Sequence, residues 1–489
     1  MIRRLPSSPD LEAYRLMCAG HFADALPFAE QAVAGKRVCV PAHGMLATIL
    51  LQLGRVNDAE ALVSQALKCE QGIADAYDAL AHVSMLLGQH ERSNALYRRT
   101  VEISPDTARF WYNLASSERS FGRLPQAEAA CDRAIALDRT QYAAYLLRSE
   151  LRVQSQEANH LQELRAQLAR SDIGDGPRVL LGYALAKELD DLQRYDEAFR
   201  WFAEAASTRR RHLDYDVAVD ERKMRRIAEV FLRQLSDSRP AHDESDRYIF
   251  IVGLPRSGTT LLERILTGLP GVRSQGETDH FARSLMTAAS DVQAAQDIFQ
   301  RTAAADPIKV AANYATLANA GASADRIIEK LPMNYLYLGA IRRALPQAKL
   351  LLMRRSPLDS CFAMYRTLFG EAYPFSYDFM DLARYYAAYE GLIAHWRAVL
   401  GDELHEIAYE DLVREPLRVG ATVARVCGVP WTDAAVDVNK NTSVSLTASA
   451  AQIRRPIYAS SCGRWRHYRK HLEPLVLALQ GYGILLPEL

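Results

Sequence analysis

The chain has 489 residues, more than one hydrophobic core usually holds, so we expect two or three domains. Its 59 basic residues balance 59 acidic residues, which argues against a surface built as a whole to bind nucleic acid or an anionic membrane. No apolar run approaches the length of a membrane span, so no transmembrane segment is expected.

The N-terminus and the cysteines bear on the compartment. The segment MIRRLPSSPDLEAY carries two arginines but no apolar core, so we expect no secretory signal. The 7 cysteines are scattered without C-x-x-C spacing and predict neither a zinc site nor a disulfide framework. Together these features predict a cytoplasmic protein.

A 34-residue period runs through the N-terminal part of the chain. Its glycines are Gly20, Gly54, Gly88 and Gly122. Seven residues before them stand Ala13, Ala47, Ala81 and Ala115, and five residues after them stand Ala25, Ala59, Ser93 and Ala127. Small residues suit close helix crossings and glycine suits the turn between helices, so each repeat predicts a helical hairpin.

This repeat resembles the tetratricopeptide repeat (TPR), whose hairpins stack into a superhelix with a concave groove. After about residue 150 the phase is lost, and Ala186, Ala198, Phe202 and Ala205 then restore it with the register shifted by three residues. We therefore predict at least five hairpins. The groove is an expected site for a peptide or a partner helix; an array that only caps the C-terminal domain, or forms a homodimer, is the alternative.

A polar joint follows the repeats. Residues 212–235 are expected to be helical, whereas residues 236–246 are polar, contain a proline and lack periodicity, as interdomain joints do. We therefore divide the chain into a repeat domain at 1–212, a helical connection and linker at 213–246, and a C-terminal domain at 247–489.

The C-terminal domain opens with a predicted strand, loop and helix. Residues 248–252 are mostly β-branched or aromatic, as in a buried parallel strand, and apolar residues at 261, 262, 265 and 266 mark one face of a helix. The loop between them is bounded by Gly253 and Gly258. Such a loop directs backbone N–H groups and the positive end of the helix dipole to one point, so it predicts a phosphate-binding site.

The spacing of this loop is that of the nucleotide-binding P-loop, except that Thr259 occupies the place of the lysine. That lysine would reach the β- and γ-phosphates of a nucleoside triphosphate. The cation here is Arg256, inside the loop, and no aspartate ends the later strand at 350–353 to hold Mg²⁺. A triphosphate therefore fits poorly, although a P-loop kinase acting on an alcohol remains an alternative.

The segment PRSGTT after a hydrophobic strand resembles the 5′-phosphosulfate loop of sulfotransferases. These enzymes bind 3′-phosphoadenosine-5′-phosphosulfate (PAPS) on a P-loop-like α/β fold with a parallel sheet and need no metal. The resemblance implies that the 5′-phosphosulfate is held by Pro255, Arg256, Ser257, Gly258, Thr259 and Thr260. Arg256 would also take part in catalysis.

Two further motifs resemble those of sulfotransferases that act on protein tyrosine. Glu277, followed by a threonine, would be the general base, since a carboxylate can take the proton of an acceptor hydroxyl. Lys330, at the end of a short predicted strand and two residues before a proline, would stabilise charge on the leaving phosphate. A solvated loop glutamate and a surface lysine are the alternatives.

After the predicted strand at 349–353, the sequence resembles the motif that binds the 3′-phosphate through an arginine and a serine eight residues later. Arg355 supplies the arginine, since a guanidinium makes bidentate contacts to phosphate. The expected serine is replaced by Ala363. Ser360, one turn earlier, or Thr367, one turn later, would take its place.

Two later segments complete the predicted nucleotide site. Residues 379–400 are expected to form an amphipathic helix, and residues 404–408 a strand ending at Tyr409, which in the family can reach the nucleotide; core packing is its alternative. Residues 453–471 are basic, without an acid, and predict an anion site rather than a nucleic-acid surface. By the resemblance this segment closes over the nucleotide through Gly463, Arg464 and Trp465, and Ser449, Gln452 and Arg455 match the family's approach to it.

We therefore predict a multidomain protein: an all-α TPR superhelix followed by an α/β P-loop-like sulfotransferase domain with a parallel sheet. It would transfer the sulfuryl group of PAPS to an acceptor hydroxyl, and no metal is expected. The glutamate motif favours a tyrosine and the TPR groove favours a peptide or protein, but a glycan, lipid or small molecule stays open. The rivals are the kinase and a TPR adaptor whose C-terminal domain has lost catalysis.

Overall fold

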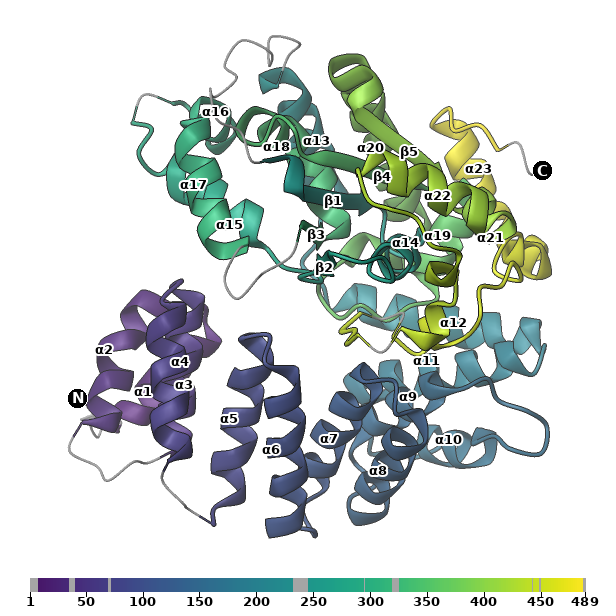
Figure 1. The fold of residues 1–489 in the computed structure, drawn as a ribbon. Coiled ribbons are helices and arrows are strands. Elements are labelled where there is room, and N and C mark those ends of the chain that lie inside the picture. Colours follow the sequence, from purple (N-terminus) through teal and green to yellow (C-terminus); the bar gives the residue numbers. More distant parts are fainter. Residues whose placement is uncertain are drawn as a thin grey trace, which may run out of the picture. The chain divides into compact units, whose positions relative to one another are not determined.

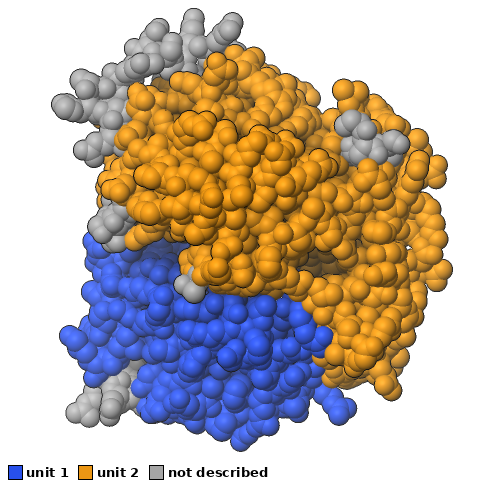
Figure 2. Space-filling view, turned by 45° about the vertical axis from the view of Figure 1, so that its right-hand side comes forward, with its two compact units in different colours: residues 1–152 blue, residues 153–489 orange. Residues whose placement is uncertain are grey.

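The computed structural model describes residues 8–34, 40–68, 72–231, 245–293, 295–318, 325–441, 443–447 and 450–486. The chain divides into two compact units, residues 1–152 and residues 153–489, which Figure 2 colours separately. Most of the predicted linker, residues 236–244, lies outside the described residues. Among the described residues, no helix is long and apolar enough to cross a membrane.

The first unit is all-helical (Figure 1). Its helices are α1 (Pro9–Cys18), α2 (Phe22–Val33), α3 (Val40–Gln52), α4 (Val56–Leu67), α5 (Ala74–Leu86), α6 (His90–Ile103), α7 (Ala108–Ser120), α8 (Leu124–Leu137) and α9 (Tyr142–Leu151). Helices α1 to α8 pack as consecutive hairpins, and each hairpin contacts the next. The predicted helical repeat is confirmed.

The repeated residues explain these hairpins. The four alanines at 13, 47, 81 and 115 are fully buried, and so are the alanines at 25, 59 and 127. The four periodic glycines follow the first helix of each hairpin and adopt φ values of 77°, 79°, 72° and 75°. A residue with a Cβ is strained in this left-handed region, so glycine is the residue that reverses the chain most easily here.

A further hairpin belongs to the second unit. It consists of α11 (Asp175–Asp191) and α12 (Tyr195–Arg211), with α10 (Leu161–Leu168) before it and α13 (Val217–Val230) after it. Its small residues Ala186 and Ala198 are fully buried, as the shifted repeat predicts, and Gln193 takes the glycine place with φ 59°.

This hairpin packs against the α/β part of the same unit. The Tyr183 hydroxyl donates to the Tyr365 carbonyl at 3.1 Å, and Arg210 pairs with Asp381 at 2.7 Å. The boundary between the two compact units, after residue 152, therefore lies about sixty residues before the domain boundary predicted at residue 212. The repeat pattern marks where hairpins form, whereas the compact units reflect which surfaces bury each other.

Among the residues that the structure describes, the α/β part is built on a parallel sheet of five strands (Figure 1). The strands are β1 (Tyr248–Gly253), β2 (Val272–Ser274), β3 (Arg326–Lys330), β4 (Lys349–Arg354) and β5 (Leu404–Ala408). Their order is β2-β3-β1-β4-β5, and all neighbouring pairs are parallel. The chain places β3 on one side of β1 and β4 on the other, which makes the carboxyl end of β1 a topological switch point.

Helices cover both faces of this sheet, as a parallel sheet requires. The helices of this part are α14 (Thr259–Leu266), α15 (His280–Ala289), α16 (Ile298–Ala304), α17 (Pro307–Ala318), α18 (Leu338–Ala344), α19 (Pro357–Tyr365), α20 (Phe379–Leu400), α21 (Tyr409–Arg414), α22 (Pro416–Val426) and α23 (Glu473–Gly481), of which α16 and α23 pack on other helices. Alternate residues of β1 face opposite layers. Ile249 and Ile251 belong to the core with α14 and α22, whereas the Phe250 ring lies 5.7 Å from that of Phe281. The predicted α/β architecture is confirmed.

We expect the turn conformation to set part of the stability of each hairpin. Gly88→Gln would lower the free energy of unfolding by about 1 kcal/mol, because a side chain is strained at φ 72°. No atom lies within 4 Å of a Cβ built at Gly88, so this cost reports the backbone alone. The matched reverse change, Gln193→Gly, would raise stability by a similar amount. Calorimetric melting of both variants measures these changes in stability. Melting temperatures that shift in the same direction would contradict the prediction.

Candidate functional site

The loop after β1 is held closely against its neighbours. A Cβ at Gly253, whose φ is 149°, would lie 2.6 Å from the Met353 carbonyl oxygen of β4. A Cβ at Gly258, whose φ is 104°, would lie 2.4 Å from the ring of Tyr409. Both positions therefore require glycine, and the loop carries the backbone directly to the start of α14 at Thr259.

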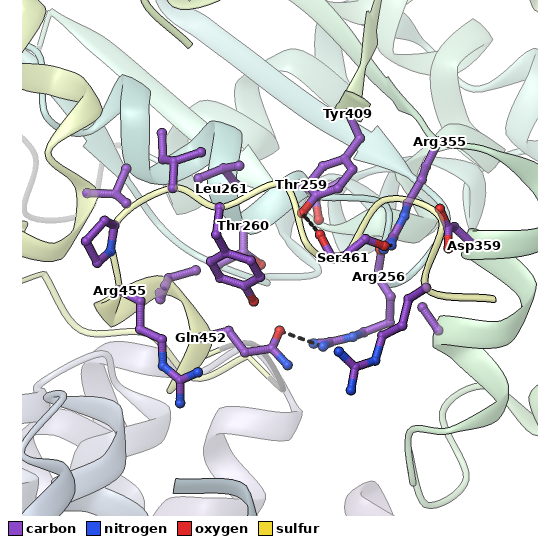
Figure 3. Close-up of a pocket in the computed structure, with 18 of the residues that line it drawn as sticks. Arg256, Thr259, Thr260, Leu261, Arg355, Asp359, Tyr409, Gln452, Arg455 and Ser461 are labelled. Carbon is purple, nitrogen blue, oxygen red and sulfur yellow. Dashed lines mark hydrogen bonds between the residues drawn. The ribbon is translucent and has the colours of Figure 1, made fainter. Parts of the chain in front are cut away.

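The side chains of this loop present polar groups in a buried place. Arg256 has φ 65°, a conformation that costs a non-glycine residue of the order of 1 kcal/mol and is typical of functional sites. Its Nη2 donates to Gln452 Oε1 at 2.7 Å (Figure 3). The Ser257 hydroxyl is buried without a hydrogen-bond partner among the described residues. Buried polar atoms are normally paired, so this hydroxyl is suited to a ligand.

Arg355 stands directly after β4 and connects three parts of the site. Its guanidinium donates to the carbonyls of Arg256 at 3.0 Å and Ser461 at 2.6 Å, and it lies 4.8 Å from the centre of the Tyr409 ring. The Arg355 Nε is buried without a partner among the described residues. The hydroxyls of Tyr409 and Ser461 share a hydrogen bond of 2.6 Å (Figure 3). Burial raises the pKa of Tyr409, so its phenol stays protonated.

A pocket opens between the loop, α19 and the C-terminal basic segment (Figure 3). The structure brings many of the predicted residues to its lining: Arg256, Gly258, Thr259, Thr260, Arg355, Tyr409, Gln452, Arg455 and Arg464. Residues that the sequence analysis missed also line it, among them Asp359, Arg366 and Ser461. Arg366 could have been found from the sequence, because it follows Ala363, at the expected serine position, by one helical turn.

Other predicted nucleotide residues do not line this pocket. Ser360 is buried, and its hydroxyl donates to the Arg355 carbonyl at 3.4 Å, whereas Ala363 does line the pocket. Pro255, Ser257, Gly463 and Trp465 are also absent from the lining. The backbone N–H of Gly463 donates to Asp359 at 2.5 Å, which ties the basic segment to α19. Ser449 lies outside the described residues.

Glu277 and Lys330 meet on the other side of the loop. Lys330 ends β3 next to Ile251 of β1, and Glu277 follows β2. The fully buried Lys330 Nζ donates to Glu277 Oε1 at 2.5 Å and lies 3.6 Å from Glu263 of α14. Glu277 keeps about a third of its side chain exposed, at 35%. The structure thus pairs the predicted base with the predicted cation, and neither residue lines the pocket of Figure 3.

A phenol that the sequence analysis did not single out lies near this pair. Burial, together with the negative charge of Glu277, raises the pKa of Tyr373, so its hydroxyl stays protonated. The Tyr373 ring packs edge-on against Phe369 at 4.8 Å. These aromatic rings come from the segment after α19, which carries no motif in the sequence.

Protein-family models match both the α/β part and the helical repeats of the chain. Residues 248–433 match the model described as the sulfotransferase family. Three tetratricopeptide-repeat models match residues 16–83, 79–144 and 184–216. The third match begins within α11 and covers α12, where the sequence predicts the shifted repeat.

Curated relatives match at low identity. An uncharacterised protein of Aquifex aeolicus is 27% identical over 378 residues, which are 74% of this chain and 49% of that protein. The protein-tyrosine sulfotransferase of Drosophila melanogaster is 26% identical, covering 44% of this chain and 46% of that protein. Protein-tyrosine sulfotransferase 1 of Danio rerio is 27% identical, and the match covers 44% of this chain and 65% of that protein. The chain thus spans about half the length of the first two relatives.

A likeness to solved structures is present but weak. The sulfotransferase domain of a Synechococcus olefin synthase is 22% identical, covers 51% of this chain and 99% of its own, and has a TM-score of 0.35. The family match and the parallel sheet agree, and residues 248–433 therefore form a domain of the sulfotransferase family that follows tetratricopeptide repeats.

Proposed function

We propose that this chain transfers the sulfuryl group of PAPS to an acceptor hydroxyl, the tyrosine side chain of a peptide or protein. The observation that carries the proposal is the convergence at one edge of the parallel sheet. The phosphate-binding loop follows β1, Arg355 follows β4, and the Glu277–Lys330 pair joins the ends of β2 and β3. Ligands of open α/β sheets bind at this edge.

The residues present fit the donor. The buried Ser257 hydroxyl and the Nε of Arg355 have no partners among the described residues, and each suits an anionic oxygen. The N-terminus of α14 adds backbone N–H groups for the 5′-phosphosulfate, together with the hydroxyls of Thr259 and Thr260. Arg355 and the basic segment would hold the 3′-phosphate. PAPS supplies the activated sulfuryl group.

The Glu277–Lys330 pair supplies the proton chemistry. Glu277 is the exposed member, so an acceptor hydroxyl can reach its carboxylate and give up a proton. Lys330 is buried and fixed between two carboxylates, Glu277 and Glu263. A cation held in this way can stabilise the charge that develops as the donor bond breaks, and Arg256 in the loop can do the same.

Two observations support a tyrosine of a peptide or protein as acceptor. Two of the curated relatives are named protein-tyrosine sulfotransferases. The N-terminal repeats suggest interaction with another protein, since stacked hairpins commonly present a groove for a peptide.

The donor assignment predicts which nucleotide binds. We expect adenosine 3′,5′-bisphosphate, the product left by PAPS, to bind without added metal and more tightly than Mg²⁺·ATP, because Thr259 replaces the lysine that a triphosphate requires. Isothermal titration calorimetry with both nucleotides checks this. Preferential binding of Mg²⁺·ATP would favour a kinase, and binding of neither would favour a non-catalytic adaptor.

Arg355 and Arg354 form a matched pair for testing the nucleotide site. Arg355→Gln would weaken bisphosphate binding by about tenfold to a hundredfold, the range for losing charge-assisted hydrogen bonds. Arg354 instead pairs with Glu390 of α20 at 2.7 Å, so Arg354→Gln would lower the melting temperature but leave the affinity unchanged. Titration calorimetry measures the bisphosphate affinity of both variants, and thermal melting measures their stability. Equal losses of affinity would argue against a ligand role for Arg355.

Glu277→Gln tests the base. We expect the rate of sulfuryl transfer to fall by about a hundredfold or more, since general base catalysis contributes at least this much, while bisphosphate affinity stays within about twofold. Transfer is measured from radiolabelled PAPS to tyrosine-containing peptides, with phenylalanine versions as blanks. Asp279→Asn, an exposed change in the same loop, is the matched control. Undiminished transfer by Glu277→Gln would remove the base assignment.

A further inference from the structure

A buried carboxylate of the α11–α12 hairpin holds two arginines of the nucleotide pocket. Asp190, at 4% exposure, stands near the end of α11. Its Oδ2 accepts hydrogen bonds from Arg366 at 2.7 Å and from Arg464 at 2.6 Å, and its Oδ1 accepts one from the Tyr468 hydroxyl at 2.5 Å. Three chain segments therefore meet at one side chain.

The charges of this cluster leave it net positive. Burial raises the pKa of Asp190, but the charges of Arg366 and Arg464 outweigh burial and hold the pKa below its usual value. Asp190 is therefore ionised at neutral pH. One carboxylate facing two guanidiniums leaves one positive charge uncompensated within the cluster, and both arginines line the pocket.

Arg366 lies close to the place where Ala363 replaces the expected serine. Arg366 follows the last turn of α19, three residues after Ala363, which lines the pocket where the resemblance leads one to expect a serine. A hydroxyl is therefore missing at this place, and a guanidinium is available one turn later. A guanidinium binds phosphate through two parallel hydrogen bonds, so it can replace a hydroxyl there.

The same hairpin also holds the segment that carries Arg464. This short helical segment, Arg464–His471, packs on α12 through ring contacts of His467 with Tyr195 at 4.5 Å and of His471 with Phe199 at 4.4 Å. Arg464 is thus fixed at its side chain by α11, while the segment behind it rests on α12. The hairpin therefore supports the side of the pocket that Arg366 and Arg464 line, although none of its own residues lines the pocket.

We propose that Asp190 is a positioning residue of the nucleotide pocket, which holds Arg366 and Arg464 side by side to bind the 3′-phosphate of the donor in place of the missing serine. This inference rests on the proposed function. It also makes the α11–α12 hairpin, which has the repeat pattern of the N-terminal unit, a part of the donor site.

The test compares two nucleotides that differ only in the 3′-phosphate. Asp190→Asn would weaken the binding of adenosine 3′,5′-bisphosphate by about tenfold, because the freed guanidiniums lose their common orientation. The binding of adenosine 5′-phosphate would change by less than about twofold, because its phosphate lies on the loop after β1. Calorimetry on the full chain measures both affinities, and an equal loss for both nucleotides would show that Asp190 only supports the fold.

Three further variants separate positioning from folding. Asp196→Asn removes an exposed carboxylate that pairs with Lys470 and His471 on the same segment, and it should leave both affinities within about twofold. In an Arg366→Gln, Arg464→Gln background, Asp190→Asn should cause no further loss, since its effect acts through these arginines. If Asp190→Asn fails to fold, Tyr468→Phe removes one hydrogen bond to Asp190 and should lower bisphosphate affinity alone, by about threefold.

The outcomes distinguish the two proposals. If the unaltered protein does not bind the bisphosphate, the proposed function fails. If it binds and Asp190→Asn binds equally well, the proposed function stands and the positioning role of Asp190 is overturned. An additional loss from Asp190→Asn in the double-arginine background would also overturn it.

Discussion

The close packing of the loop after β1 is the constraint on which the site depends. Gly253 presses against the β4 backbone and Gly258 against the Tyr409 ring, so the loop cannot shift without moving β4 or α21. This contact brings the loop within hydrogen-bond reach of Arg355, which donates to the Arg256 carbonyl. Gly258 and Thr259 at the start of α14 thereby line the same pocket as Arg355, and the buried Ser257 hydroxyl belongs to the same loop.

The charges around that loop are set by partners from distant parts of the chain. Glu277 and Glu263 surround the Lys330 ammonium on one side of the loop, and Asp190 holds two guanidiniums on the other. A buried charge is costly unless it is paired, so each of these contacts both stabilises the fold and orients a group at the site. The protein can therefore place several cations next to one another because carboxylates from other elements keep them in position.

The local patterns of the sequence could predict most of the fold. The fully buried alanines and left-handed glycines of the repeats follow from their 34-residue spacing, and the strand, loop and helix at 248–266 follow from apolar periodicity and two glycines. The Glu277–Lys330 pairing could be anticipated, because parallel strands end at one edge of a sheet. Ser360 lies one turn from the expected serine, but its hydroxyl donates to the Arg355 carbonyl and Ser360 does not line the pocket.

By itself, the sequence determined which segments form hairpins, which form strands and where the glycine-bounded loop after β1 lies, because these depend on residues close together along the chain. Only the tertiary structure decided that Asp190 meets Arg366 and Arg464, 176 and 274 residues away, and that the α11–α12 hairpin belongs to the second compact unit. Periodicity indicates that a helix has a buried face but not which surface covers it. The partner of a charged side chain is likewise chosen by packing between elements, which no local spacing records.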